Sequence, residues 1–214
     1  MEDEGNKLYY FNANGRAMII RAILYYSKTK FDNILITKEN WKIEKKSGKF
    51  QYEQLPMLEF EGKKYVQSHA IELFLGRTFK LYGKNNEEDY QINTLLDSFD
   101  DLFSVFKHVF DPITEEDKQH IEDYKRALLN KYEFFAESCE KKYISNGGKK
   151  YYLGDNFSLA DIFLTCTFYY YADLMGIEKS LEEHAPKLSK VVENVKNNEL
   201  KEFYDKAYFK ESEY

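Results

Sequence analysis

The period of the hydrophobic pattern changes once along the chain, near residue 82. Before that point, short strand-like runs alternate with helical runs, and after Gly83 every periodic segment repeats like a helix. The sequence therefore predicts an α/β domain over residues 1–82, followed by an all-α domain over residues 83–214. The segment between them is too short for two independent domains.

The first part is predicted to follow the order β-α-β, connector, β-β-α. We expect strands over 8–11, 31–36, 57–60 and 64–66, and helices over 16–26 and from Ser68 onward. A β-α-β unit implies two parallel strands joined by a right-handed connection. The last two strands flank Glu61-Gly62-Lys63 and are expected to form a hairpin.

The second part is predicted to contain only helices. They are expected from a cap at Asn86 to about residue 110, from Thr114 to about 145, and over 158–175, 186–196 and 198–206. Ser158 and Asp161 have the spacing of a capping box, with Ser158 as the N-cap. Helix capping explains both residues, so no catalytic role is assigned to them.

Composition and charge exclude several classes of function. A net charge of −6 with interspersed lysines argues against nucleic-acid binding, and no apolar run is long enough to span a membrane. The four histidines and two cysteines lack metal-ligand spacing, so no metal site is predicted. A disulfide reductase is excluded because the first part has no cysteine. The acidic N-terminus lacks a signal-peptide core, which predicts a cytoplasmic protein.

The first predicted strand ends in a pair of tyrosines, Tyr9 and Tyr10, followed by Phe11 and the small polar turn Asn12-Ala13-Asn14-Gly15. In α/β folds such a junction exposes side chains and backbone N–H groups to a ligand. The alternative is a packed strand end with a tight loop, and this segment alone favours that alternative.

Two further segments carry groups suited to a peptide-like ligand. Pro56 begins a predicted strand, its preceding peptide bond is the chain's best cis candidate, and the backbone N–H and C=O of Leu55 are expected to be free for an extended peptide. Ser68, after Gln67, starts a helix whose positive end suits a carboxylate. The alternative is a strand-starting proline and an ordinary serine cap.

Taken together, the motifs resemble a known family over nearly the whole chain. The carrying segments are KLYYFNANGRAMIIRAIL, QLPMLEFEG, QSHAIELFLGR and NFSLADIFL. They are similar to those of the cytosolic glutathione S-transferases, and most similar to the sigma class. The resemblance implies a thioredoxin-like N-terminal domain, and an all-α domain that forms the electrophile pocket and part of the interface of a homodimer.

The resemblance gives Tyr10 the catalytic position and puts Tyr9 on the opposite strand face. Glutathione is the implied co-substrate, its thiolate attacking a small hydrophobic electrophile held against the helix over 92–110 and the C-terminal Tyr208-Phe209. A thiol has a pKa of about 8.5, and a charge-assisted hydrogen bond of about 1.5–3 kcal/mol would lower that pKa by roughly one to two units. Tyr10 is thus expected to be a hydrogen-bond donor.

The family's glutathione-binding positions also map onto this sequence. They fall on Trp41, Lys45, Gln54, Leu55, Pro56, Gln67 and Ser68, with Asp100 or Asp101 reaching the ligand across a dimer interface. Trp41 could equally be a core ring, and the lysine-rich stretch around Lys45 leaves its alignment open. Asp97, Asp100 and Asp101 share a helix face, which more often indicates a solvated surface, although some sigma-class proteins hold a divalent cation there. The predicted chemistry requires no metal.

The chain departs from the sigma-class pattern at two places. Asn14 stands where the class often has an arginine, which puts the degree of thiol activation in question and keeps open a non-catalytic, lens-crystallin-like protein. The sequence around His108 lacks the tryptophan of the prostaglandin D synthases, so prostaglandin isomerisation is a weaker alternative than conjugation.

Overall fold

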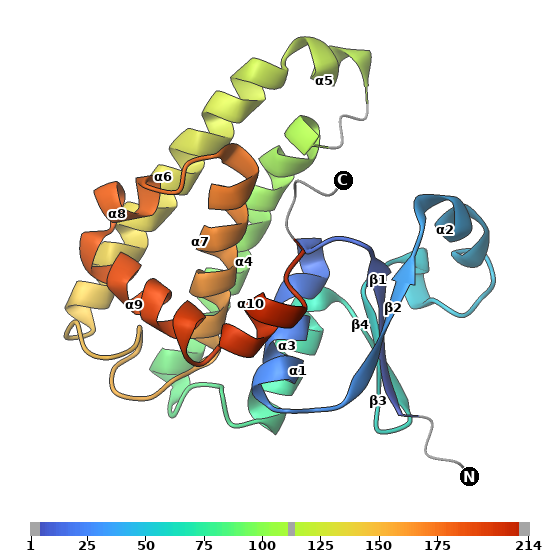
Figure 1. The fold of residues 1–214 in the computed structure, drawn as a ribbon, viewed down its shortest axis with the longest axis horizontal. Coiled ribbons are helices and arrows are strands. Elements are labelled where there is room, and N and C mark those ends of the chain that lie inside the picture. Colours follow the sequence, from blue (N-terminus) through green and yellow to red (C-terminus); the bar gives the residue numbers. More distant parts are fainter. Residues whose placement is uncertain (1–4, 111–113, 210–214) are drawn as a thin grey trace. The chain divides into compact units, whose positions relative to one another are not determined.

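The computed structural model describes residues 5–110 and 114–209 (Figure 1). They form two compact units. Unit 1 contains the residues up to Tyr82 and those from Lys196 onward, and unit 2 runs from Gly83 to Val195. The division after Tyr82 coincides with the change of hydrophobic period. The C-terminal residues, which the sequence analysis placed in the helical domain, belong to unit 1.

Unit 1 is built on a four-stranded mixed sheet with the strand order β2-β1-β3-β4. The strands are β1 (Asn6–Phe11), β2 (Phe31–Ile36), β3 (Met57–Phe60) and β4 (Lys63–Val66). β1 pairs parallel with β2 and antiparallel with β3, and β3 pairs antiparallel with β4. The predicted β-α-β unit and hairpin are both confirmed. Glu61 and Gly62 have φ of 49° and 73°, as the two central residues of a type I′ hairpin turn require.

The helices of unit 1 are α1 (Met18–Tyr26), α2 (Lys38–Glu44), α3 (Ser68–Thr78) and α10 (Lys201–Lys206), with 3-10 turns over Gly15–Ala17 and Gln51–Glu53. The sequence analysis missed one of these helices, and α1 and α10 begin two and three residues later than predicted. α2 was missed; Thr37 caps it by accepting a hydrogen bond from the Asn40 N–H. α3 has Gln67 as its N-cap, with φ of 71°, so the prediction of Ser68 as the cap is wrong by one residue.

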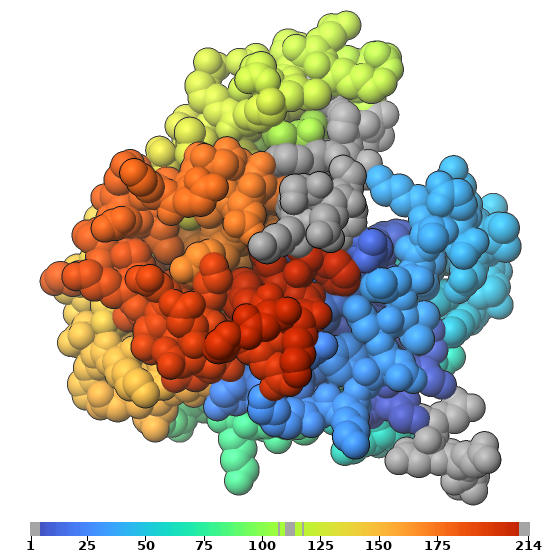
Figure 2. Space-filling view, in the orientation of Figure 1, coloured from blue at the N-terminus to red at the C-terminus, as the bar shows by residue number. Residues whose placement is uncertain are grey.

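Residues near the C-terminus pack against α1 within unit 1. Phe203 of α10 is 1% exposed, and its ring centroid lies 6.3 Å from that of Tyr25. Lys28 pairs with Glu202. In the space-filling view the red surface of α10 lies against the blue surface of α1 (Figure 2). Burial of Phe203 therefore explains why these residues belong to unit 1.

The elements of unit 2 that the structure describes are helices, apart from one isolated bridge between Tyr151 and Gly154 in a loop. Its helices are α4 (Asn86–Phe110), α5 (Glu115–Gln119), α6 (Ile121–Ser145), α7 (Leu159–Met175), α8 (Ser180–His184) and α9 (Pro186–Asn197). Aromatic rings pack against one another in its core: the rings of Phe99 and Phe163 lie 5.9 Å apart and those of Tyr132 and Phe168 lie 5.7 Å apart. No helix among the described residues is both long enough and apolar enough to cross a membrane.

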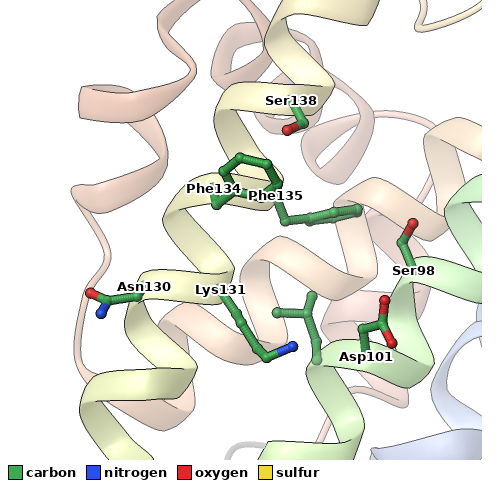
Figure 3. Close-up of a pocket in the computed structure, with 8 residues that line it drawn as sticks. Ser98, Asp101, Asn130, Lys131, Phe134, Phe135 and Ser138 are labelled. Atoms are coloured by element: carbon green, nitrogen blue, oxygen red, sulfur yellow. The ribbon is translucent and has the colours of Figure 1, made fainter.

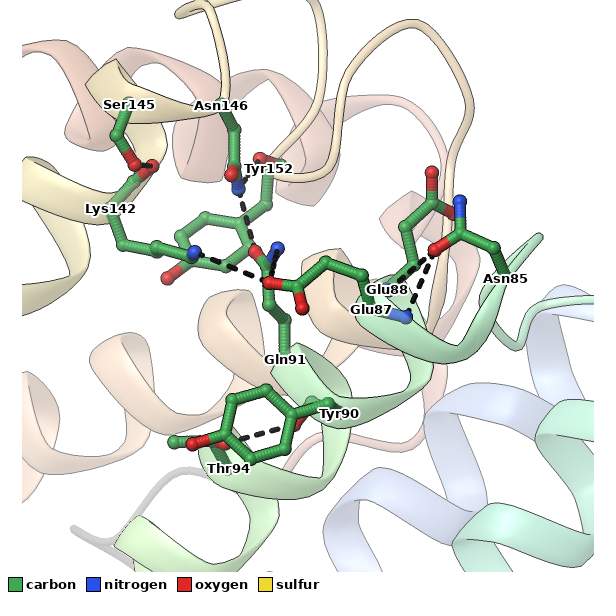
Figure 4. Close-up of polar contacts among 10 residues, drawn as sticks. All are labelled: Asn85, Glu87, Glu88, Tyr90, Gln91, Thr94, Lys142, Ser145, Asn146 and Tyr152. Atoms are coloured by element: carbon green, nitrogen blue, oxygen red, sulfur yellow. Dashed lines mark hydrogen bonds and ion pairs between the residues drawn. The ribbon is translucent and has the colours of Figure 1, made fainter.

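Polar side chains fix the start of α4 against the end of α6 (Figure 4). The side chain of Asn85, not of Asn86 as predicted, caps α4 by accepting hydrogen bonds from the backbone N–H groups of Glu87 and Glu88, both at 3.0 Å. Asn146 donates to the buried Gln91 at 2.9 Å. The two Asn85 bonds satisfy backbone N–H groups at the start of α4 that would otherwise lack partners, and the Asn146 bond joins α4 to the end of α6.

The predicted capping box at the start of α7 is confirmed. Asp161 accepts hydrogen bonds from the Ser158 N–H and hydroxyl, both at 2.9 Å, and from the Tyr152 N–H at 2.8 Å. Its carboxylate is fully enclosed, and burial raises the pKa of Asp161 to about 6 in spite of these three donors. This carboxylate organises the fold of unit 2.

Candidate active site in unit 1

The strand register brings the predicted site segments to one edge of the sheet. Tyr9 is paired with Met57, and Met57 is paired with Val66, so these three residues form a row across β1, β3 and β4. The residues directly beyond that row are Tyr10, Pro56 and Gln67. β2 ends at the same edge because it is parallel to β1, and α2 follows it. Segments far apart in sequence thus meet at this edge.

Tyr9 and Tyr10 point to opposite faces of the sheet, as predicted. The Tyr9 hydroxyl donates to Glu59 at 3.1 Å, and its ring lies 5.9 Å from that of Phe50. The Tyr10 hydroxyl accepts a hydrogen bond from the Arg16 N–H at 3.0 Å, in the turn before α1. Tyr9 therefore packs into a cluster behind the sheet, whereas Tyr10 faces the turn.

The Tyr10 hydroxyl is buried but not saturated with hydrogen bonds. Tyr10 is 7% exposed, and within residues 5–110 and 114–209 its hydroxyl hydrogen has no acceptor. Burial raises the pKa of Tyr10, and the Arg16 N–H and the charges of Arg21 and Arg16 only partly offset this. The phenol is therefore protonated near neutral pH and has a hydrogen to donate.

Gly15 allows the turn to approach this hydroxyl. Its φ is +39°, and a Cβ there would lie 2.6 Å from the Tyr10 oxygen. A side chain would thus collide with the hydroxyl and strain the backbone. Gly15 is needed for the position of Tyr10.

Arg21 supports the same turn and was missed by the sequence analysis, which treated it only as part of a helix pattern. It is fully buried, and it donates to the Ala13 carbonyl at 2.6 Å and to the Asn33 side chain at 3.2 Å. Its guanidinium carbon lies 5.8 Å from the centroid of the Tyr10 ring. A buried cation in an otherwise apolar helix face was the available signal.

The Leu55-Pro56 bond is cis, as expected for this position. In the described part of the chain, neither the N–H nor the C=O of Leu55 has a hydrogen-bond partner. Gln67 donates to Gln54 at 3.1 Å, so these two predicted residues are in contact. Ser68 is buried at the first position of α3. These residues provide an unpaired strand edge beside a helix N-terminus.

Trp41 and Lys45 are four residues apart, on α2 and at its C-cap. The Trp41 ring packs at 5.1 Å from the Phe50 ring and at 6.2 Å from the Phe11 ring. It belongs with Leu55 to the half-buried rim of the cluster that contains Tyr9 and Met57. Trp41 therefore packs against core residues, which is one of the two roles that the sequence left open for it.

Asp100 and Asp101 lie on α4 in unit 2, and both are exposed. Asp101 borders a hollow of about 390 Å³ between α4 and α6 (Figure 3). The other lining residues are Ser98, Leu102, Asn130, Lys131, Phe134, Phe135 and Ser138. Among the residues that the structure describes, no three His, Cys, Asp or Glu side chains are grouped as metal ligands, and this includes Asp97, Asp100 and Asp101.

Comparison with known proteins agrees with this geometry. Residues 86–199 match the family described as "Glutathione S-transferase, C-terminal domain". A probable glutathione S-transferase 5 of Caenorhabditis elegans is 32% identical over 162 residues, which cover 73% of this chain and 75% of that protein. The chain belongs to the glutathione S-transferase family.

Solved transferase structures share the fold of both units. A major glutathione S-transferase of the nematode C. elegans aligns with a TM-score of 0.81 and 28% identity over 96% of this chain and 98% of that one. Prostaglandin synthase D of Nilaparvata lugens aligns with a TM-score of 0.78 and 28% identity over 96% and 99%. The predicted fold class, a thioredoxin-like unit followed by an all-helical transferase domain, is confirmed.

Proposed function

We propose that this glutathione S-transferase conjugates the glutathione thiolate to small hydrophobic electrophiles, and that Tyr10 activates the thiol. The observation that carries the proposal is the buried Tyr10 hydroxyl, which accepts the Arg16 N–H and has no acceptor for its own hydrogen within the described residues. A thiolate placed before Tyr10 would receive that hydrogen. The proton on sulfur leaves to solvent, because Tyr10 is already protonated.

The energetic requirement is modest. A charge-assisted hydrogen bond contributes about 1.5–3 kcal/mol, and one pKa unit corresponds to about 1.4 kcal/mol. The bound thiol would then have a pKa of roughly 6.5–7.5 instead of about 8.5, so a large part of it is thiolate at neutral pH. Arg21 helps by holding the turn carbonyl of Ala13.

The remaining glutathione contacts are proposed from groups at the same sheet edge. The unpaired N–H and C=O of Leu55, beside Pro56, suit the cysteinyl backbone of the tripeptide. The N-terminus of α3 at Ser68, next to Gln67, suits a carboxylate.

Three further side chains are proposed to extend that binding surface. Gln54 holds the Gln67 amide in place. Trp41 and Lys45 on the α2 segment are proposed to face the glycyl end, where the Lys45 ammonium can pair with the terminal carboxylate.

The test compares Tyr10→Phe with the matched variant Tyr9→Phe. We expect Tyr10→Phe to lower kcat/KM at pH 7 by roughly ten- to a hundredfold, which corresponds to the lost hydrogen bond. Tyr9→Phe should stay within about threefold of wild type, since its hydroxyl contacts Glu59 on the other face. Equal effects of the two substitutions on conjugation rate would refute the assignment.

We further propose that the enzyme is a sigma-class, cytoplasmic, detoxifying homodimer in which Asp100 and Asp101 complete the glutathione site of the partner. Phe134, which is 71% exposed beside Asp101, supports an interface on the face formed by α4 and α6. Sedimentation equilibrium should give twice the chain mass. A mass near 25.6 kDa at micromolar concentration would contradict the dimer.

A prostaglandin isomerase is the second candidate, favoured by the alignment with a prostaglandin synthase. It would use the same Tyr10-activated thiolate. Incubation with a prostaglandin endoperoxide and glutathione distinguishes the two, since a conjugating enzyme would yield no more isomerised product than the uncatalysed reaction.

A further inference from the structure

Asn14, the residue that departs from the sigma-class pattern, has its own place in unit 1. It is fully buried. Its side-chain N–H donates to the Phe209 carbonyl at 2.5 Å, and its side-chain oxygen accepts the Phe209 N–H at 3.1 Å. The amide thus pairs with both backbone groups of one residue, 195 positions away, as a neighbouring strand would.

The side chain of Phe209 lies over the group that also borders Tyr10. The guanidinium carbon of Arg21 is 4.8 Å from the centroid of the Phe209 ring and 5.8 Å from that of Tyr10. Arg21 donates to the Ala13 carbonyl, directly before Asn14. Phe209 and Tyr10 therefore lie beside the same buried cation.

The base of this segment is fixed separately. The N–H groups of Ala207 and Tyr208 both donate to the Phe203 carbonyl, at 2.8 and 3.0 Å, and Phe203 is buried against α1. Only Asn14 holds the backbone of Phe209 by hydrogen bonds within the described residues. Loss of the Asn14 amide would release the tip of the segment and leave its base in place.

We propose that Asn14 is a positioning residue that clamps Ala207–Phe209 beside the Tyr10 turn, and that Phe209 thereby forms an aromatic wall that determines electrophile affinity. The role of Phe209 in electrophile binding rests on the proposed function. The hydrogen bonds between Asn14 and Phe209 can be tested without an activity assay.

The first measurement is amide hydrogen exchange at Phe209. In wild type this N–H should be protected, and in Asn14→Ala its exchange should be at least about tenfold faster, because the acceptor has been removed. Asn12→Ala is the matched control: Asn12 is the same residue type, in the same turn, but exposed. It should leave the exchange rate unchanged. Unchanged exchange in Asn14→Ala would overturn the clamp.

The second measurement separates positioning from mere stability. With a dinitro-substituted aryl chloride as electrophile, Asn14→Ala should raise the KM for the aryl chloride by roughly three- to tenfold, the value of one aromatic contact. The KM for glutathione and the pKa of the bound thiol should not change. Faster amide exchange at Phe209 together with an unchanged KM for the aryl chloride would overturn the proposed role of Phe209.

Two further variants keep the test decisive. Phe209→Ala retains the backbone bonds to Asn14, so it should raise the KM for the aryl chloride without faster exchange, and the double variant with Asn14→Ala should be no worse than either single one. If Asn14→Ala does not fold, the nearly isosteric Asn14→Leu removes both the donor to the Phe209 carbonyl and the acceptor of the Phe209 N–H, and the same faster exchange is expected. Failure of thiol activation in wild type would refute the proposed function and leave the exchange result intact.

Discussion

Asp161 in unit 2 and Tyr10 in unit 1 are both buried, but they differ in how completely their hydrogen-bonding groups are satisfied. Asp161 in unit 2 receives three hydrogen bonds from Tyr152 and Ser158. Tyr10 in unit 1 receives a single one, from Arg16, and has no acceptor for its own hydrogen among the described residues. A saturated buried group stabilises the fold, whereas an unsaturated one leaves a hydrogen-bonding group for a ligand.

Burial raises the pKa of both groups, with different consequences. For Tyr10 a raised pKa keeps the hydroxyl protonated, which is the state that can donate to a thiolate. For Asp161 it favours the neutral acid and makes the stability of unit 2 depend on pH. The comparison predicts that substitutions in the capping box change stability, and that substitutions around Tyr10 change chemistry.

The largest expected effect is on stability, from Asp161→Ala. The substitution leaves the N–H groups of Tyr152 and Ser158 buried without a partner, at about 1–3 kcal/mol each. The free energy of unfolding, measured with urea, should fall by roughly 2–6 kcal/mol. Asp155→Ala is the control. Asp155 is exposed, and within residues 5–110 and 114–209 its side chain forms a surface ion pair with Lys149 alone, so its loss should cost at most about 1 kcal/mol. Equal losses of stability in the two variants would show that the buried Asp161 contributes no more to the fold than an exposed carboxylate.

The next effect is the pH dependence that Asp161 confers. Its folded pKa of about 6 lies above the ordinary value of 3.8, so the folded chain binds the proton more tightly than the unfolded chain. The stabilisation is therefore fully present below about pH 4 and is lost as the pH rises through 6, by up to about 3 kcal/mol. The free energy of unfolding of wild type and of Asp161→Asn, measured at several pH values, isolates this contribution. If wild type instead gained stability relative to Asp161→Asn as the pH rises, the predicted sign of the pH dependence would be wrong.

Gly15→Ala should affect both stability and chemistry. Its φ of +39° strains an L-residue by about 1–2 kcal/mol, and the new Cβ meets the Tyr10 oxygen. Gly176→Ala, at the end of α7 with φ of +65° and nothing within 4 Å, imposes similar strain without that contact. Both variants should lose stability, and only Gly15→Ala should lose conjugation rate. Equal rates would show that the hydroxyl position does not matter.

The smallest effect is expected from Tyr9→Phe, which sharpens the contrast within the tyrosine pair. The loss of the bond to Glu59 should lower the free energy of unfolding by about 0.5–1.5 kcal/mol. Conjugation should remain near the wild-type rate, as a coupled assay would show. A large loss of rate with intact stability would assign the chemistry to the wrong tyrosine.

Local sequence patterns were sufficient to predict most of the fold. The bounds of β2 and β3 agree with the prediction, and Ser158-Asp161 was identified from spacing alone, because these features depend on neighbours in sequence. Cap positions were off by one residue. Asn85 caps α4 in place of Asn86, and the N-cap position of α3 is Gln67, which makes no side-chain cap hydrogen bond, in place of Ser68.

The rest of the candidate site depends on contacts between distant segments, which the sequence alone does not contain. The two bonds between Asn14 and Phe209 join residues near opposite ends of the chain. Burial of Arg21 is likewise set by the turn that folds over it. Hydrophobic period indicates which face is buried, but it cannot tell which distant residue covers that face.

The central claim is that the Tyr10 hydroxyl stabilises a bound thiolate, and the most direct measurement is the pKa of glutathione on the enzyme. Thiolate absorbance would be followed against pH for wild type, Tyr10→Phe and Tyr9→Phe. We predict a bound thiol pKa roughly one to two units below the free value of about 8.5 in wild type and Tyr9→Phe, and a return to the free value in Tyr10→Phe. A bound thiol in wild type that titrates like free glutathione would contradict the account.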